Sequence, residues 1–438
     1  MIDGSVESRR PLDGARPPRG AEVPGVRVVM DVRALQEPSR APRTAAYLDG
    51  LLGGFDADPR PGESFAFLLA SDEDDPTVRY PGLEVIGRRL LPPVRLLRSG
   101  ALTVDPFVLR GASVGAAWRA DRGGAVGAVY HAAGGGLPIA SALPTVVTLL
   151  DLAPWEMPQT FQRGIASRFG QRLRAQLLRD ASAVIVGTEA VATAARRLLH
   201  LRPERIHVVP LAPQSAYATV GSGERRAAMV RARATAERLG LGERYLVYPG
   251  RHDARQDVVT MMSALAGLAA AGRPADLPAD ATWPPRIVVL EATPDDRASI
   301  ARVAARHGTG DQLVYAPMLS AEEGAGLVAG ARAVILPVVS EACGLTAIDA
   351  LAAGVPVIAS AVGALPEIVG TAGILVEPRD RERLAAAITT AWGDAPVRRV
   401  IARAATERAS GAGSALRTWV DVAREVREIY ATVGRPRR

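Results

Sequence analysis

Residues 340–360 read SEACGLTAIDALAAGVPVIAS. This segment follows an apolar run at Ala333–Leu336, and it contains a second apolar run at Val355–Ile358. Both runs are short and rich in aliphatic residues, which is typical of strands in a parallel sheet that is buried on both faces. The segment therefore predicts a strand, a loop, a helix and a second strand in that order.

A short helix is expected in the middle of the segment. Thr346 has the residue type of an N-cap and Gly354 that of the position after a C-cap, so the sequence predicts a helix at Ala347–Ala353. Gly344 allows backbone N–H groups to approach a ligand closely. The positive end of the helix adds free donors, and together these features suit a diphosphate.

Two carboxylates lie near the start of this helix. Glu341 precedes the helix and is placed to accept hydrogen bonds from hydroxyl groups. Asp349 is one turn inside it. Two interpretations stay open for Asp349: a ligand contact at the helix mouth, or a capping partner of Thr346, three residues earlier.

Strands and helices alternate through both halves of the chain. In the first half the expected strands are Val26–Met30, Phe65–Ala70, Val126–Tyr130, Thr145–Leu149, Ala183–Val186 and Ile206–Val209. In the second half they are Tyr245–Tyr248, Arg286–Leu290, Leu313–Tyr315, Ala333–Leu336, Val355–Ile358 and Ile374–Val376. This alternation predicts an α/β protein with two Rossmann-like, doubly wound parallel-sheet domains that face each other across a cleft. A ligand is expected in the cleft, at the carboxyl ends of the strands.

The domain boundaries follow from composition. Residues 1–24 carry Arg, Pro and Gly without an apolar core and are expected to be a disordered tail. An N-terminal domain is expected at 25–211, a linker at 212–223 and a C-terminal domain at 224–414. A last helix at 415–433 carries an apolar stripe and is expected to pack back on the N-terminal domain.

Composition limits the classes of function. The chain has 438 residues, and its 53 basic side chains are all arginine, which is typical of codon usage in a GC-rich bacterial genome. A net charge of +7 and only 4% aromatic residues argue against nucleic acid as a partner. The single Cys343 excludes an internal disulfide and a cysteine-based zinc site.

No targeting or membrane segment is expected. Residues 1–24 lack the apolar core of a signal peptide. Gly123–Leu150 carries no formal charge and is long enough to cross a bilayer, but Gly134–Gly136, Pro138 and Pro144 interrupt it. Two buried strands are therefore favoured over a spanning helix, and the protein is expected to be cytoplasmic.

The residues quoted above resemble a known family. The segment that contains Glu341 and Asp349 is similar to the signature of retaining nucleotide-sugar glycosyltransferases of the GT-B fold (family-4-like, glycosyl transferases group 1), which has two glutamates separated by seven residues. Tyr248–Asp257 resembles the phosphate-binding turn of that family, and Thr148–Leu152 its T-x-H-D-L stretch. The resemblance extends over roughly Val26–Val433.

The resemblance implies a hexosyltransferase of glycan biosynthesis. It would move a sugar from a nucleotide-diphosphate donor to a glycan, lipid or small-molecule acceptor with retention of configuration, and it would need no metal or other cofactor. The resemblance implies Glu341 as the catalytic residue. The donor-binding residues that it implies are Arg251, Arg255, Gln256, Gly344, Leu345, Thr346 and Asp349. His131 and Asp151 are assigned to the acceptor site or the cleft, and a purely structural histidine is the alternative for His131.

Four ligand-facing positions depart from the family pattern. Gln256 stands where the family has a lysine, Asp349 where it has a second glutamate, and Leu150 where it has a histidine. Glu37–Thr44 contains no glycine where the family has a glycine-rich turn. The alternative hypothesis is therefore a catalytically impaired relative that binds a sugar nucleotide, a glycan or a partner enzyme.

Weaker signals complete the sequence reading. Five arginines on a predicted helix near Gly164–Asp180 indicate a solvated face, with a peripheral contact to the inner membrane face as the alternative. Cys343 is interpreted as small filler and not as a nucleophile. A phosphorylase or an epimerase on the same fold is a third hypothesis. A dehydrogenase is disfavoured because no G-x-G-x-x-G follows a first strand.

Overall fold

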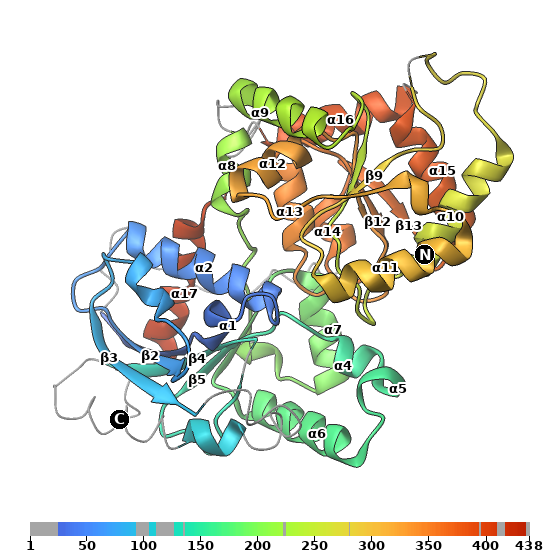
Figure 1. Ribbon diagram of the computed structural model, residues 1–438. Coiled ribbons are helices and arrows are strands. Elements are labelled where there is room, and N and C mark those ends of the chain that lie inside the picture. The colour runs from blue at the N-terminus through green and yellow to red at the C-terminus, as the bar shows by residue number, and fades with distance from the viewer. Residues whose placement is uncertain are drawn as a thin grey trace, which may run out of the picture.

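The computed structural model describes residues 25–92, 105–110, 127–134, 136–221, 225–279, 281–393, 396–409 and 417–434. Two parallel sheets form the centres of two domains (Figure 1). The predicted α/β fold with two doubly wound domains is confirmed. The first sheet has the strand order β3-β2-β1-β4-β5-β6-β7 and the second β10-β9-β8-β11-β12-β13. Both orders run outward in two directions from a central pair, so each sheet has a switch point where a crevice opens.

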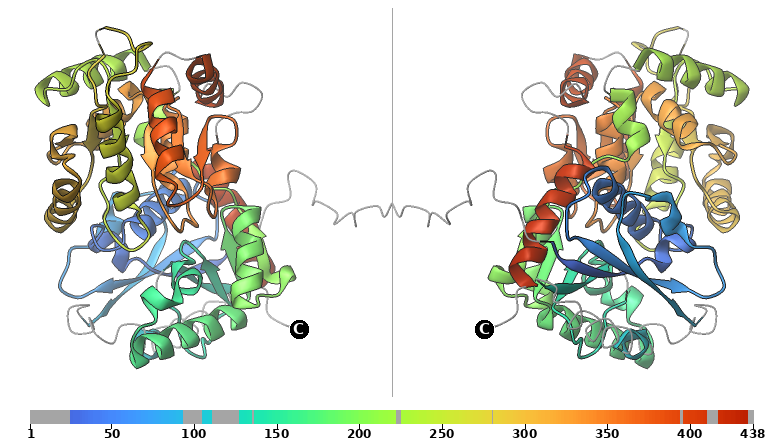
Figure 2. Two further views of the ribbon diagram at one scale, coloured as in Figure 1. Left: turned by 90° about the vertical axis from the view of Figure 1, so that its right-hand side faces the viewer. Right: turned by 90° about the vertical axis from the view of Figure 1, so that its left-hand side faces the viewer.

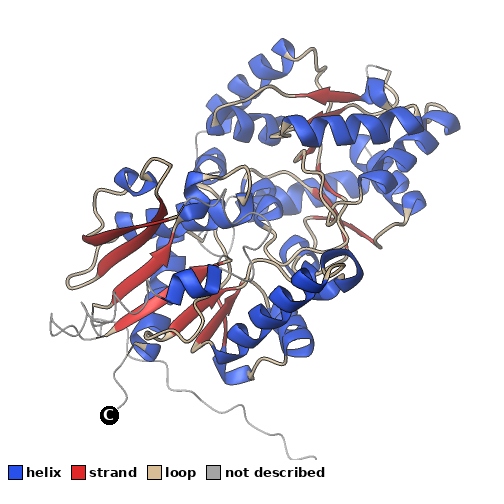
Figure 3. Cartoon of the chain, turned by 60° about the horizontal axis from the view of Figure 1, so that its bottom comes forward, coloured by secondary structure: helices blue, strands red, loops and turns tan. Residues whose placement is uncertain are grey.

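The N-terminal sheet consists of β1 Arg27–Asp31, β2 Ser64–Ala70, β3 Val85–Leu91, β4 Ala128–Ala133, β5 Thr145–Thr148, β6 Ala183–Val186 and β7 Ile206–Val208. Its helices are α1 Arg33–Gln36, α2 Pro42–Ala57, α4 Ala153–Glu156, α5 Pro158–Phe161, α6 Ile165–Asp180 and α7 Glu189–Leu199, with 3₁₀ turns at Pro76–Arg79 and Pro203–Arg205. Figure 3 shows these strands side by side with helices packed against them.

The C-terminal sheet consists of β8 Leu246–Tyr248, β9 Ile287–Val289, β10 Leu313–Tyr315, β11 Val334–Leu336, β12 Val357–Ser360 and β13 Gly373–Val376. Its helices are α8 Ser215–Gly221, α9 Arg225–Arg238, α10 Val258–Ala271, α11 Pro294–His307, α12 Ala321–Gly330, α13 Leu345–Ala352, α14 Leu365–Val369, α15 Arg381–Trp392 and α16 Pro396–Ala409, with a 3₁₀ turn at Gly310–Gln312. Helix α8 falls within the predicted linker 212–223, and it contacts α12 and α13 of the C-terminal domain.

The last helix, α17 Trp419–Val433, lies against α2 of the N-terminal domain although it follows α16 of the other domain in the chain (Figure 2). Two glycines on α2 permit this close approach. A Cβ atom at Gly50 would lie 2.1 Å from the Trp419 ring, and one at Gly54 would lie 2.2 Å from the Trp419 carbonyl oxygen. Small residues one turn apart therefore let the two helix backbones meet.

β4 and β5 both lie within the uncharged stretch Gly123–Leu150, as the prediction of two buried strands requires. Among the described residues, no helix has the length and apolarity needed to cross a bilayer. One edge strand, β3, is absent from the sequence prediction. Three of its residues in a row, Arg88 to Leu90, are exposed, so the strand lacks the apolar run that marks the central strands.

Candidate active site

Helix α13 begins at the carboxyl end of β11 and faces the N-terminal domain. Its N-cap is Gly344, with a φ of +71°, and not Thr346 as predicted. Glycine is required there because the left-handed backbone disfavours a side chain and because a Cβ would lie 2.2 Å from the Ile368 side chain. Gly354 follows the last turn with a φ of +74°, which agrees with the predicted end of the helix.

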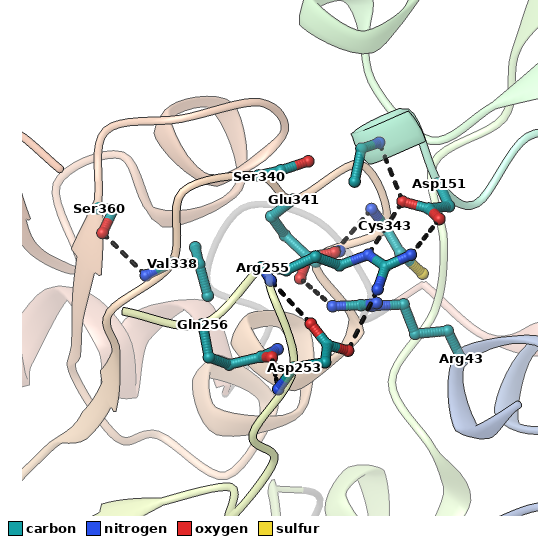
Figure 4. A network of polar contacts seen from close by, with 12 residues as sticks. Arg43, Asp151, Asp253, Arg255, Gln256, Val338, Ser340, Glu341, Cys343 and Ser360 are labelled. Carbon is teal, nitrogen blue, oxygen red and sulfur yellow. Dashed lines mark hydrogen bonds and ion pairs between the residues drawn. The ribbon is translucent and has the colours of Figure 1, made fainter. Parts of the chain in front are cut away.

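The Glu341 carboxylate caps this helix. Its Oε1 accepts hydrogen bonds from the backbone N–H groups of Cys343 (2.9 Å) and Gly344 (3.0 Å). The Gly344 amide is one of those expected to contact a diphosphate, and here it donates to a carboxylate of its own loop. Glu341 Oε2 also lies 3.3 Å from Arg43 Nη2 of the N-terminal domain, which forms an ion pair across the interface (Figure 4).

Arg255 forms the second ion pair between the domains. Its Nε donates to Asp151 Oδ1 at 3.1 Å, and its Nη2 bonds the other carboxylate oxygen of Asp151. Its guanidinium also contacts Asp253 and lies 4.9 Å from the centre of the Phe161 ring. Burial alone would raise the pKa of Asp151, but the hydrogen bonds and charge of Arg255 lower it overall. The structure thus brings the predicted Asp151 and Arg255 together.

Arg251 and Gln256 flank Arg255 in the loop after β8. Arg251 Nη2 donates to the Ser39 carbonyl at 3.3 Å, across the domain interface, and its Nη1 lies 3.6 Å from Asp296. The Gln256 side chain instead turns back on its own loop, where its Oε1 accepts from the Asp253 N–H at 2.9 Å. Gln256 therefore stabilises the turn and presents no cation to the cleft.

Asp349 is buried and does not contact Thr346, whose side chain is exposed. The capping interpretation of Asp349 is therefore wrong. Its two carboxylate oxygens accept hydrogen bonds from the backbone N–H and the side-chain amide of Gln214, each at 2.8 Å. Gln214 immediately precedes α8, so Asp349 fixes the connection between the domains. Leu345 is buried in the first turn of α13.

Burial raises the pKa of Asp349 to about 7, and the hydrogen bonds from Gln214 oppose this rise. The native state consequently binds this proton more tightly than the unfolded chain, so the stability contributed by this group falls as pH rises from its ordinary pKa of 3.8 toward 7. We expect the unfolding free energy of the protein relative to D349N to decrease by about 1–3 kcal/mol between about pH 5 and about pH 8. Urea unfolding at both pH values measures it, with the exposed D180N as control. An equal difference at both pH values would contradict the prediction.

The assignment of His131 to the cleft is wrong. His131 is fully buried on β4, where its ring nitrogens contact the Tyr430 hydroxyl (2.6 Å) and the Thr148 hydroxyl (2.9 Å). Burial lowers its pKa to about 3. Tyr430 belongs to α17, so His131 joins the sheet to that helix, and the structural alternative describes it correctly.

Leu150 and Cys343 line the interface as apolar groups. Leu150 is buried and lies against Gly134, at the end of β4. Cys343 is also buried, and burial raises its pKa to about 12. A thiol with such a pKa stays protonated near neutral pH, which agrees with the filler interpretation.

Two arginines near the site were not assigned from the sequence. Arg43 lacks any sequence signal except its place in the segment that replaces the glycine-rich turn. Arg174 belongs to the arginines read as a solvated helix face, but its Nη2 donates to the Gly134 carbonyl (3.3 Å) and its guanidinium lies 5.5 Å from the Trp155 ring. Its Nε is buried without a partner among the described residues.

The outer face of α6 is partly apolar. Ile165 is 82% exposed and Phe169 58% exposed. Arg168 and Arg172 are exposed on the same helix. Membrane contact through this face stays a prediction.

Two facing doubly wound sheets, with charged groups meeting between them at the start of α13, define a protein of the GT-B fold. Residues 243–394 match the family described as glycosyl transferases group 1. This match lies within the C-terminal domain and agrees with the sequence resemblance.

Individual relatives agree with this assignment. A D-inositol 3-phosphate glycosyltransferase of Nocardioides sp. is 36% identical over 129 residues, which cover 28% of this chain and 26% of the relative. The chain thus spans about a quarter of the length of the curated relatives it matches. Among solved structures, sucrose-phosphate synthase from Thermosynechococcus elongatus has a TM-score of 0.66 at 18% identity and covers 93% of this chain and 98% of its own. Anabaena HepE, solved with UDP and glucose, has a TM-score of 0.63 at 17% identity and covers 92% and 99%. These structural similarities show that the chain shares the fold of these two proteins.

Proposed function

We propose that the protein transfers a hexose from a nucleotide-diphosphate donor to a hydroxyl-bearing acceptor, with retention of configuration. One observation carries the proposal: Glu341, Arg255 and the N-cap amide of α13 lie together at the carboxyl ends of the C-terminal strands. This is where an open parallel sheet binds its ligand. The structural neighbour with bound UDP and glucose, and the relatives named glycosyltransferases, support the same activity.

The leaving diphosphate governs the chemistry of such a site. The bond between the sugar C1 and the terminal phosphate oxygen breaks, C1 bonds to the acceptor oxygen, and the acceptor proton passes to the departing diphosphate. In this proposal Arg255, Arg251 and the amides at the start of α13 stabilise the negative charge that develops on that group. Glu341 is placed to accept hydrogen bonds from the sugar hydroxyls once it leaves the amides.

Ligand binding requires exchange of counterions. In the structure Asp151 is paired with Arg255, and Glu341 accepts hydrogen bonds from the Cys343 and Gly344 amides. A diphosphate must therefore replace two carboxylates before it contacts these groups. On the N-terminal side, Arg174 is the candidate contact for an anionic acceptor, because its Nε has no partner among the described residues.

Calorimetric titration with UDP, GDP and ADP at constant salt tests the proposal. We expect one nucleoside diphosphate to bind selectively, and R255Q to bind it about 10- to 100-fold more weakly, since a hydrogen bond to a charged group is worth about 1.5–3 kcal/mol. The exposed R302Q on α11 is the control and should bind normally. Absence of binding to all three nucleotides would favour the alternative, a non-catalytic relative.

A further inference from the structure

The C-terminal domain lacks a cation at position 256. The glycosyltransferase pattern has a lysine there, whereas the Gln256 side chain accepts a hydrogen bond within its own loop. Glutamine cannot supply the positive charge that a lysine places on phosphate. Arg251 and Arg255 remain on the C-terminal side of the site, and a further cation near them would replace the charge of the lysine.

Arg43 reaches the same site from the opposite domain. It is the second residue of α2, and its Nη2 lies 3.3 Å from Glu341 Oε2, next to the amides at the start of α13. Figure 4 shows its guanidinium beside that of Arg255. Burial and the nearby charge of Arg43 lower the pKa of Arg255, but the carboxylates of Asp151 and Asp253 raise it overall.

Helix stability does not explain this position. A cation in the first turn of a helix lies at the positive end of the helix dipole, where anions are favoured. Helix α2 has no acidic residue in its first turn, and its N-cap, Ala41, makes no side-chain cap hydrogen bond. The start of α2 therefore carries a positive potential, and the carboxylate that compensates it, Glu341, belongs to the other domain.

Two adjacent guanidinium groups repel one another unless anions separate them. Here Asp151 and Asp253 neutralise Arg255, and Glu341 neutralises Arg43. Each domain thus places a carboxylate on an arginine of the other domain. Two adjacent arginines whose counterions are carboxylates of the opposite domain suit a ligand with two linked anionic groups, because arginine binds phosphate oxygens with parallel hydrogen bonds.

We propose that Arg43 is a donor-binding residue that replaces the missing lysine and binds the nucleotide diphosphate together with Arg255. Since Arg43 belongs to the N-terminal domain, the diphosphate site is complete only when the two domains are closed. This inference rests on the proposed function and adds to it a binding side chain in the segment Glu37–Thr44, where the family has a glycine-rich turn.

The test compares UDP, UMP and uridine, with the corresponding guanine and adenine ligands, in calorimetric titrations of the full chain. We expect R43Q to bind the preferred nucleoside diphosphate roughly 10- to 100-fold more weakly and the matching nucleoside unchanged. R40Q, which removes an exposed arginine of the same segment, should bind normally. The double variant R43Q/Q256K returns a cation to the site and should recover most of the lost affinity.

Three outcomes would overturn the inference. Unchanged diphosphate binding in R43Q, while R255Q loses it, would remove Arg43 from the site. An equal loss for diphosphate and nucleoside, without rescue by Q256K, would make Arg43 a contact that only closes the domains. If the unaltered protein binds no nucleoside diphosphate, the proposed function fails first and the inference with it. Far-UV circular dichroism and a melting curve of each variant show that it is folded.

Discussion

Replacement of Glu341 by glutamine is expected to lower sugar transfer about 100- to 1000-fold and to leave the fold intact, which is the typical effect of losing one group that stabilises the transition state. The amide oxygen of glutamine still accepts from the Cys343 and Gly344 N–H groups, so the cap of α13 persists. The substitution removes the negative charge that pairs with Arg43 and that, in the proposed function, accepts hydrogen bonds from the sugar hydroxyls.

The measurement is release of the nucleoside diphosphate from UDP-glucose, GDP-mannose and ADP-glucose, using the donor that the unaltered protein consumes. The control is E382Q, which changes an exposed glutamate in the first turn of α15. A melting temperature within a few degrees of the unaltered protein shows that E341Q is folded. Unchanged transfer by E341Q would exclude Glu341 from the chemistry.

The largest effect on stability is expected from R427A, which should lower the unfolding free energy by about 3–5 kcal/mol. Arg427 on α17 is 6% exposed, and it donates to both carboxylate oxygens of Glu63 at 2.9 and 2.8 Å. Its guanidinium also covers the Phe55 ring at 4.8 Å. Truncation leaves the buried Glu63 without a counterion, and that desolvated charge accounts for most of the loss.

Urea unfolding at neutral pH checks this value. R424A removes an arginine from the same helix whose side chain is 54% exposed and paired with Asp421, and it should cost less than about 1 kcal/mol. The double variant R427M/E63L replaces the pair by apolar groups and should recover much of the lost stability. A loss below about 1 kcal/mol in R427A would show that α17 is not anchored through this pair.

The central strands of both sheets could be predicted from sequence because they are buried on both faces and therefore read as unbroken apolar runs. β3 could not be predicted in this way, because the exposed Arg88 and Arg89 give this edge strand the polar sequence of a loop. The start of α13 was misplaced for a local reason. The sequence predicts a side-chain cap at Thr346. In the structure Gly344 is the N-cap in a left-handed conformation, and the Glu341 carboxylate accepts hydrogen bonds from the Cys343 and Gly344 N–H groups.

The sequence identified residues of the candidate site more successfully than it identified their hydrogen-bond and ion-pair partners. Glu341, Asp151 and Arg255 were chosen from motifs, and the structure brings all three to one interface. Their partners are separated from them by one hundred to three hundred positions, so no local pattern relates them. The prediction for His131 was wrong because this residue contacts Tyr430, and Tyr430 reaches it only because α17 packs against the N-terminal domain.

That return has a mechanical consequence. The polypeptide passes from the first sheet to the second before α8 and comes back between α16 and α17. Two covalent connections between the domains restrict their relative movement more than a single linker would. Any separation of the domains at this interface would part Asp151 from Arg255 and Glu341 from Arg43. It also means that a fragment ending near residue 211 lacks the helix that closes its own core, so the first domain cannot be excised as one continuous piece.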